Sequence, residues 1–226
     1  MKSKSGILFL CLIILTGNII FAQAKPVSLK KLKSVDIGNP SIAGSTKITD
    51  NKLILNAGGA DIWNKRDEFR FAYIQQSGDF DLISKVESLT DPHLYTKAGL
   101  MVREELTEDS RHIYFMVFPN NKPRNKNNGG YEYQYRMEKG GDSKAIYPSK
   151  FDGTPEFPVN YPETWVRLKR VGNEYTGFYS PDGTTWKPFT SFSLELPAKV
   201  WIGPAVTSHN AKAATEAVFS SLSLLK

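Results

Sequence analysis

The stretch "KAGLMVREELTEDSRHIYFMVF", residues 97–118, decides the fold of this protein. Its two arms alternate apolar side chains with polar or mixed ones at a period of two, which is typical of antiparallel strands with one face in a core. The inward set comprises Ala98, Leu100, Val102, Ile113, Phe115 and Val117. The outward set comprises Lys97, Gly99, Met101, Arg103, His112, Tyr114 and Met116. The stretch therefore predicts a β-hairpin whose outward face carries cations, an imidazole and a phenol.

Short runs of β-branched, aromatic or alternating residues recur along the rest of the chain, separated by turn sequences such as Gly172-Asn173. Besides the hairpin, the predicted strands cover residues 52–57, 68–75, 79–88, 131–138, 164–171, 174–180, 200–208 and 216–224. No long helix is expected beyond residue 40. Many short strands without intervening helices predict an all-β fold, a two-sheet antiparallel jelly-roll β-sandwich. Because no repeat or linker divides the chain, residues 25–226 are predicted to form a single domain.

The first residues, "MKSKSGILFLCLIILTGNIIFAQA" (1–24), combine a basic start, an apolar run and an Ala-Gln-Ala ending. This pattern predicts a secretory signal peptide cleaved after Ala24. Polar residues at 16–18 interrupt the apolar run, so a permanent membrane span is not expected. Cys11, the only cysteine of the chain, falls within the same segment, so the exported chain would form no disulfide. The sequence predicts export and leaves the periplasm and the cell exterior both open.

The charge balance is mildly basic, with 29 Lys and Arg against 23 Asp and Glu, or +6. Without residues 1–24, which hold two lysines and no acid, it becomes +4. Two basic clusters, at 29–33 and 121–126, lie on no recognisable DNA- or RNA-reading motif. We therefore expect no nucleic-acid partner, and we expect a monomer.

Several stretches, in order, resemble a known family: "AGGADIW" (57–63) and the runs at 67–89, 97–104, 164–186 and 201–209. They resemble the enolase-regulator-like domains of the concanavalin A-like lectin and glucanase superfamily. The resemblance implies a two-sheet jelly roll whose curved sheet presents a concave groove for carbohydrate. It leaves the activity open, because that superfamily holds lectins, hydrolases, lyases and non-catalytic modules. The E-x-D-x-x-E pattern of its glucanases is absent from the sequence, and "VREEL" (102–106) matches the R-T/S-E-x-R pattern of its alginate lyases only in part.

Strand parity gives candidates for the groove, since alternate residues share one face. The candidate site residues are Lys97, Arg103, His112, Tyr114, Gln134, Arg136, Trp165, Arg167 and His209. At 131–136 the phase is open, because either Glu132, Gln134 and Arg136 or the three intervening tyrosines face outward. Strand cations are more often simply solvated, and His and Tyr are often half-buried packing residues. The convergence of such groups from remote segments favours the functional interpretation.

The favoured hypothesis is an enzyme that eliminates across uronic acid units of acidic oligo- or polysaccharides. Arg103 and Arg136 would hold the carboxylate, because guanidinium groups suit carboxylates and stabilise the charge that develops there. His112 or His209 would take the adjacent proton, and Tyr114 would protonate the departing oxygen. The other substrate-binding residues would be Lys97, Gln134, Trp165 and Arg167. Lyase cleavage and dehydration both remain open, and neither needs a metal or another cofactor.

The alternative is a non-catalytic carbohydrate-binding protein that uses the same groove, with Trp165 or Tyr114 stacking on the sugar. A hydrolase would need two suitably spaced carboxylates. Neither Glu132 with Glu138 nor Glu104 with Glu105 makes a persuasive pair, so this activity ranks last. His93 is interpreted as a loop residue, and Trp63 as a packing residue.

Overall fold

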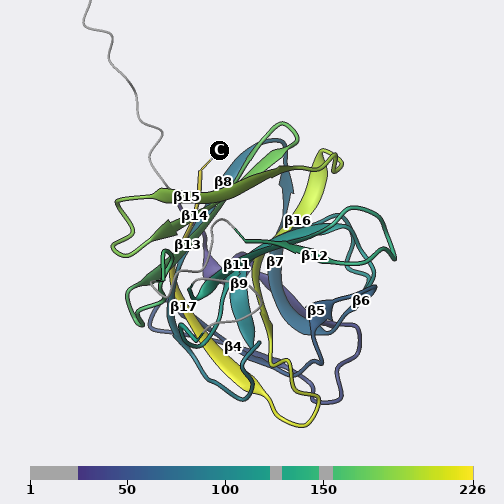
Figure 1. Ribbon diagram of the computed structural model, residues 1–226, viewed down its shortest axis with the longest axis vertical. Coiled ribbons are helices and arrows are strands. Elements are labelled where there is room, and N and C mark those ends of the chain that lie inside the picture. The colour runs from purple at the N-terminus through teal and green to yellow at the C-terminus, as the bar shows by residue number, and fades with distance from the viewer. Residues whose placement is uncertain (1–24, 123–128, 148–154, 226) are drawn as a thin grey trace, which may run out of the picture.

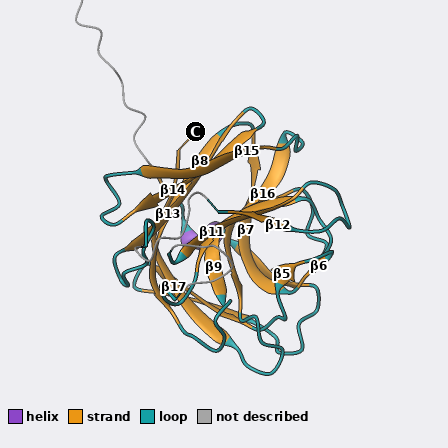
Figure 2. Ribbon diagram, in the orientation of Figure 1, coloured by secondary structure: helices purple, strands orange, loops and turns teal. Residues whose placement is uncertain are grey.

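The computed structural model describes residues 25–122, 129–147 and 155–225. Most of these residues belong to strands, as Figure 2 shows. The predicted signal peptide lies outside the described residues. The one helical element in the described ranges is a 3-10 turn, η1 (Leu29–Lys31). In this part of the chain, no helix is long and apolar enough to cross a membrane.

Eight antiparallel strands form the first sheet, in the order β15-β14-β13-β8-β17-β4-β3, with β1 paired to β17. Their bounds are β1 (Lys25–Pro26), β3 (Ser45–Thr49), β4 (Lys52–Ala57), β8 (Phe80–Leu89), β13 (Thr164–Val171), β14 (Glu174–Ser180), β15 (Lys187–Ser193) and β17 (Thr215–Leu225). Burial alternates along β13, where Val166 and Leu168 are buried and their neighbours are partly exposed. This sheet therefore has one face in the core and one face toward solvent.

Seven antiparallel strands form the second sheet, in the order β12-β11-β10-β9-β16-β7-β2. Their bounds are β2 (Lys33–Ile37), β7 (Phe69–Ser77), β9 (Lys97–Arg103), β10 (His112–Val117), β11 (Tyr131–Arg136), β12 (Lys144–Ile146) and β16 (Lys199–Thr207). Every residue of β9 and of β10 is buried. The centre of this sheet is therefore covered on both faces.

The main core lies between the two sheets. It contains all six residues that the alternation of residues 97–118 places inward: Ala98, Leu100, Val102, Ile113, Phe115 and Val117. Tyr131 and Tyr133 belong to the same core. The open phase of β11 is thereby settled, because Glu132, Gln134 and Arg136 must face the opposite side of the sheet.

The other face of the second sheet carries a smaller apolar cluster, in which Met101, Tyr114 and Met116 pack with Ile62. Ile62 comes from a separate two-stranded ribbon, β5 (Ile62–Trp63) and β6 (Arg66–Asp67). Figure 1 shows this ribbon on the side of the second sheet opposite β13, β14 and β15. The unusual outward residues of the opening hairpin therefore lie mostly beneath other parts of the chain, not in water.

The predicted strands at 52–57, 164–171 and 174–180 match β4, β13 and β14 residue for residue. The prediction of an all-β, two-sheet antiparallel sandwich is confirmed. The predicted strands do not include β2, β3 and β15, since sequences such as "STKIT" (45–49) and "KPFTSFS" (187–193) contain many polar residues and alternate weakly. They also do not include the two- or three-residue strands β1, β5, β6 and β12, which are too short to give a pattern.

Candidate functional site

Three predicted groove residues, Arg103, His112 and Arg136, surround the carboxylate of Asp67, a β6 residue. All four side chains are completely buried. Asp67 Oδ1 accepts a hydrogen bond of 2.6 Å from Arg136 Nη2, and Oδ2 accepts bonds of 2.8 Å from Arg136 Nη1 and 3.1 Å from Arg103 Nη1. His112 Nδ1 lies 3.6 Å from the same Oδ2. We call this group the Asp67 cluster.

The Asp67 cluster sets the protonation of its members. Burial alone would raise the pKa of Asp67, but the surrounding positive charges and the hydrogen bonds from Arg136 hold it below its usual value. Burial, with the charges of Arg136 and Arg103, outweighs the effect of Asp67 and lowers the pKa of His112 to about 3. The imidazole is therefore neutral at neutral pH. The expectation that these three residues line an open groove is wrong, because they join β6 to the second sheet beneath the surface.

Tyr114 is also fully buried. Its hydroxyl donates a 2.9 Å hydrogen bond to the carbonyl oxygen of Ala205, and burial raises its pKa well above the usual value. Its ring packs in the smaller apolar cluster. The structure therefore places this phenol inside the protein, with its hydroxyl already hydrogen-bonded, and not on an open groove.

Trp165 and Arg167 lie on β13, in the other sheet. Arg167 forms a two-point ion pair with Asp81, with distances of 2.7 Å from Nε and 2.5 Å from Nη2, and its guanidinium lies over the rings of Phe178 and Trp186. Parity correctly indicates that these side chains face outward. They face outward on the opposite side of the sandwich, so they do not join the other candidates.

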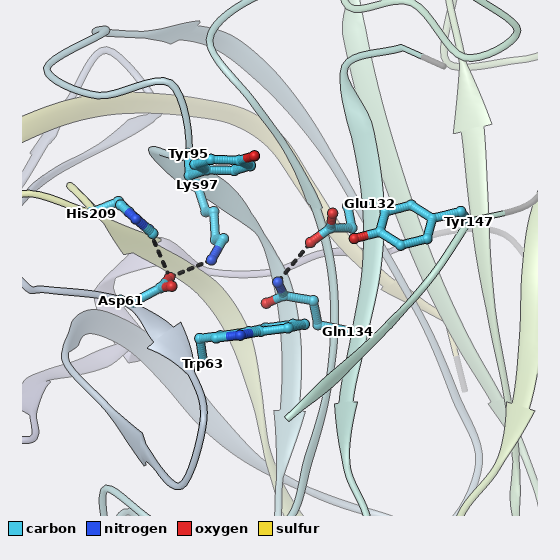
Figure 3. A pocket seen from close by; sticks show the side chains of 8 residues that line it. All are labelled: Asp61, Trp63, Tyr95, Lys97, Glu132, Gln134, Tyr147 and His209. Atoms are coloured by element: carbon cyan, nitrogen blue, oxygen red, sulfur yellow. Dashed lines mark hydrogen bonds and ion pairs between the residues drawn. The ribbon is translucent and has the colours of Figure 1, made fainter. Parts of the chain in front are cut away.

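Lys97, Gln134 and His209 do meet, in a pocket of about 150 Å³ on the covered face of the second sheet. Figure 3 shows the eight side chains that line it. They are Asp61, Trp63, Tyr95, Lys97, Glu132, Gln134, Tyr147 and His209. We call this the central pocket.

One side of the central pocket is built around Asp61, just before β5. Its carboxylate accepts a hydrogen bond from Lys97 Nζ, and its Oδ1 lies 3.1 Å from His209 Nδ1. Burial would raise the pKa of Asp61, but the charge of Lys97 and the nearby imidazole of His209 lower it to about 2. Asp61 is therefore ionised, and the ammonium of Lys97 is already paired.

His209 reaches the pocket from the turn that follows β16. Its backbone has a positive φ of 52°, which is uncommon for a residue with a side chain. Ser208 holds the turn by donating from Oγ to the carbonyl oxygen of Gly59 at 3.0 Å. The imidazole stacks on that of His93, with ring centroids 4.3 Å apart. The turn therefore orients the His209 ring between Asp61 and His93.

The other side of the central pocket is built on β11. Gln134 Nε2 donates a 2.6 Å hydrogen bond to Glu132 Oε1, and Glu132 also shares a hydrogen bond with the Tyr147 hydroxyl. Burial raises the pKa of Glu132 against the opposing charge of Lys97. Gln134 Oε1 is buried and has no hydrogen-bond partner among the described residues. In Figure 3 this oxygen points away from Glu132, toward the Lys97 side of the pocket.

The sequence pattern did not identify four of the residues that line the central pocket. It included Glu132 only in one of the two possible orientations of residues 131–136. Tyr95 and Tyr147 lie in segments with no strand pattern, and Asp61 and Trp63 come from the short β5–β6 ribbon. His93, interpreted as a loop residue, stacks on His209 at the pocket. Strand alternation could have identified Glu132, because it lies two residues from Gln134 and therefore on the same face of the strand.

No family model and no curated protein matches this chain. Solved structures do match it. A functionally unknown protein from Saccharomyces cerevisiae has a TM-score of 0.64 at 16% identity, covering 88% of this chain and 97% of its own. The carbohydrate-binding module CBM66 from Bacillus subtilis has a TM-score of 0.54 at 13% identity, covering 85% and 95%. The exoplasmic/lumenal domain of VIP36, in a form bound to Ca²⁺ and Man3GlcNAc, has a TM-score of 0.51 at 9% identity, covering 88% and 84%.

This chain has the concanavalin A-like jelly-roll fold. At such low identity, the likeness shows the fold and not the activity. Within this jelly roll, the central pocket lies on the face of the seven-stranded sheet that points away from the main core, between that sheet and the β5–β6 ribbon. The narrower resemblance to enolase-regulator-like domains stays a prediction.

Proposed function

We propose that this protein binds carbohydrate by holding one sugar residue in the central pocket. The observation that carries the proposal is the buried carbonyl oxygen of Gln134, which points into the pocket without a partner among the described residues. A buried acceptor without a partner costs free energy, and a ligand that donates a hydrogen bond there removes that cost.

The other lining groups suit a sugar. Each sugar hydroxyl both donates and accepts, and the pocket offers carboxylate acceptors from Asp61 and Glu132 beside the ammonium of Lys97. Trp63 adds an indole, whose face suits the apolar face of a sugar ring. At about 150 Å³, the pocket is smaller than the pockets that take drug-sized molecules, and it suits a single ring. The likeness to a carbohydrate-binding module and to a sugar-bound lumenal domain supports the same class of ligand.

The charges favour a neutral sugar over a uronic acid. Lys97 is already paired with Asp61, and Glu132 adds a second carboxyl group. The two arginines expected to hold a uronate carboxylate are buried against Asp67. A ligand carboxylate would therefore compete with Asp61 for a single ammonium, which would weaken its binding.

Elimination at a uronate is the second candidate, and the pairing of His209 with Asp61 favours it. Asp61 faces Nδ1 of the imidazole, so Nε2 is the nitrogen that would take the proton from the carbon beside the uronate carboxylate. The bond from the neighbouring carbon to the departing oxygen would break as a carbon–carbon double bond forms. Tyr95 or Tyr147 would return a proton to that oxygen. In this version Lys97 replaces the two arginines as the cation.

Calorimetric titration with neutral monosaccharides, neutral oligosaccharides and uronate oligosaccharides tests the binding proposal. We expect a neutral sugar to bind, and we expect Gln134→Leu and Trp63→Ala each to weaken it by roughly tenfold or more. Trp165→Ala is the matched control, because its indole lies on the other sheet and its loss should leave the affinity unchanged. Failure of the whole panel to bind would overturn the proposal.

Ultraviolet absorbance separates the two candidates, because elimination creates a conjugated double bond and binding does not. Absorbance that grows with uronate oligosaccharides and disappears in His209→Gln would establish the second candidate.

We also propose that the protein acts in the periplasm or outside the cell, on the pattern of residues 1–24. Mass spectrometry of the mature protein, with Lys25 expected as its first residue, tests this.

A further inference from the structure

A second depression adjoins the central pocket, and the two share Asp61 and Trp63. It measures about 500 Å³, against about 150 Å³ for the central pocket. Its remaining lining comes from residues within and next to the β5–β6 ribbon and from Asp142. Trp63 therefore stands at the boundary between a small pocket and a larger polar surface.

Hydrogen bonds and ion pairs, partly buried and partly exposed, hold the second depression in place. The carbonyl oxygen of Asn64, in the turn, accepts bonds of 3.0 Å from Arg136 Nη2 and 2.7 Å from the backbone N–H of Ser143. Arg66 pairs with Glu68 at 3.3 Å and with Glu108 at 3.1 Å. The backbone of the turn is thus tied to the Asp67 cluster and to the loop before β12. This surface has a defined shape before any ligand arrives.

The exposed polar groups of this surface are mixed in charge. Lys65 is exposed and forms no ion pair among the described residues, and Asp142, also exposed, lies in the same depression. Arg66 is occupied by two carboxylates. A surface with one ammonium and one carboxylate free to hydrogen-bond suits hydroxyl groups better than it suits a strongly charged ligand.

We infer that the ligand is a neutral oligosaccharide whose terminal residue occupies the central pocket and whose next residues cross Trp63 into the second depression. This inference rests on the proposed function, and it adds the class of substrate, a chain of at least two sugar residues. Lys65 and Asp142 hold the residues beyond the first. Affinity should therefore rise with chain length, because the second depression adds hydrogen bonds that a monosaccharide cannot make.

The test is calorimetric titration of the full chain with glucose, cellobiose and cellotriose, and with the matching xylose and mannose series. In the series that binds, we expect roughly a tenfold gain in affinity from the monosaccharide to the trisaccharide, the effect of one or two added hydrogen bonds. The double variant Lys65→Ala, Asp142→Ala should lose this gain and keep the affinity for the monosaccharide. The control variant Lys47→Ala, Asp50→Ala removes the same charges at the exposed edge of the other sheet and should keep the gain.

The outcomes separate the two proposals. If no member of any series binds, the proposed function fails and this inference fails with it. If a monosaccharide binds as tightly as its trisaccharide, or if the Lys65, Asp142 variant keeps the gain, the second depression is no subsite and the pocket alone remains. Both double variants should fold normally, because Lys65, Asp142, Lys47 and Asp50 are all exposed. Circular dichroism of each variant checks this.

Discussion

Asp67 and Arg136 form a two-point ion pair in the interior of the protein, with 2.6 Å between Oδ1 and Nη2 and 2.8 Å between Oδ2 and Nη1. The pair joins β6 to β11, and Nη2 of the same arginine also donates to the carbonyl oxygen of Asn64. Because Asp61 and Trp63 precede β6 by only a few residues, the pair also fixes one wall of the central pocket. The stability of the fold and the shape of the proposed binding pocket therefore depend on the same contact.

We expect Asp67→Asn to lower the free energy of unfolding by about 3–5 kcal/mol, the usual cost of removing one partner from a buried ion pair. The guanidinium groups of Arg103 and Arg136 would keep their charges and lose the carboxylate that balances them. Urea unfolding followed by circular dichroism measures the change.

The matched control for this prediction is Glu105→Gln. Glu105 pairs with Lys139 at 2.5 Å, but both side chains are about half exposed to solvent, so the loss of stability should be much smaller than in Asp67→Asn. Equal losses in the two variants would contradict the interpretation of the Asp67 cluster as a buried electrostatic centre.

His112 makes the protein sensitive to acid. Its pKa is about 3 in the folded protein, against a usual value near 6.5, because burial and the two arginines disfavour its charged form. Between these values the unfolded chain binds a proton that the folded protein does not. The free energy of unfolding should therefore fall as the pH drops below about 6.5, by up to about 1.4 kcal/mol per pH unit from this group. The lowered pKa of Asp67 has the same sign, but it acts only below about pH 4.

Urea unfolding at a series of pH values from neutral to mildly acidic measures this slope. His112→Asn should be less stable at neutral pH and should show a flatter dependence above pH 5, since no imidazole remains in the cluster. His93→Gln is the control, because it removes an imidazole outside the cluster and should keep most of the slope. An unchanged slope in His112→Asn would show that other groups cause the acid sensitivity.

Alternation in the sequence correctly predicts which side chains of a strand face the core. It does not show on which of the two outer faces of the sandwich the remaining side chains lie. Val166 and Leu168 face the core as predicted, and Trp165 and Arg167 face away from it. A two-sheet sandwich has two outer faces, and parity is the same on both. Only the strand order, with β13 beside β8 and β14, shows that these two residues lie opposite Lys97 and Gln134.

The sequence also did not show that the outer face of the second sheet is buried beneath the β5–β6 ribbon. Asp67, which pairs with Arg103 and Arg136, lies 36 and 69 residues away from them along the chain. The ribbon that carries it has strands of only two residues, too short to produce a periodic pattern. The sequence therefore suggests that Arg103 of β9 and Arg136 of β11 bind a ligand. In the structure both pair with Asp67 of the β5–β6 ribbon, which covers them.

Gly203 should be among the least replaceable residues of the second sheet. Its φ is 155°, and a Cβ built there would lie 2.0 Å from the carbonyl oxygen of Ala72 on β7. Gly203→Ala should therefore lower the free energy of unfolding by at least about 2 kcal/mol, since the strand must move and the backbone is strained. Gly78→Ala is the control, with a φ of 71° and open space around the new methyl group. Its cost should be about 1 kcal/mol, and thermal unfolding that ranks the two variants the other way would contradict this assignment.

Lys97 and Asp61 should be strongly coupled, because Lys97 is almost fully buried and Asp61 is its partner in the central pocket. Lys97→Met removes the charge that does most to hold the pKa of Asp61 at about 2, so this pKa should rise in carboxyl-carbon NMR titrations. Since a depressed carboxyl pKa stabilises the folded protein above about pH 4, the variant should lose that stability at neutral pH.

Asp61→Asn in the Lys97→Met background should then cost less than Asp61→Asn in the original chain, because the isolated carboxylate no longer needs to be buried. The double-mutant cycle should give a coupling energy of about 1–3 kcal/mol in urea unfolding. Additive losses would mean that His209, 3.1 Å from Asp61, balances the carboxylate without help from the ammonium. In that case Lys97 would be free to bind an anionic ligand, which would favour a uronate over a neutral sugar in the central pocket.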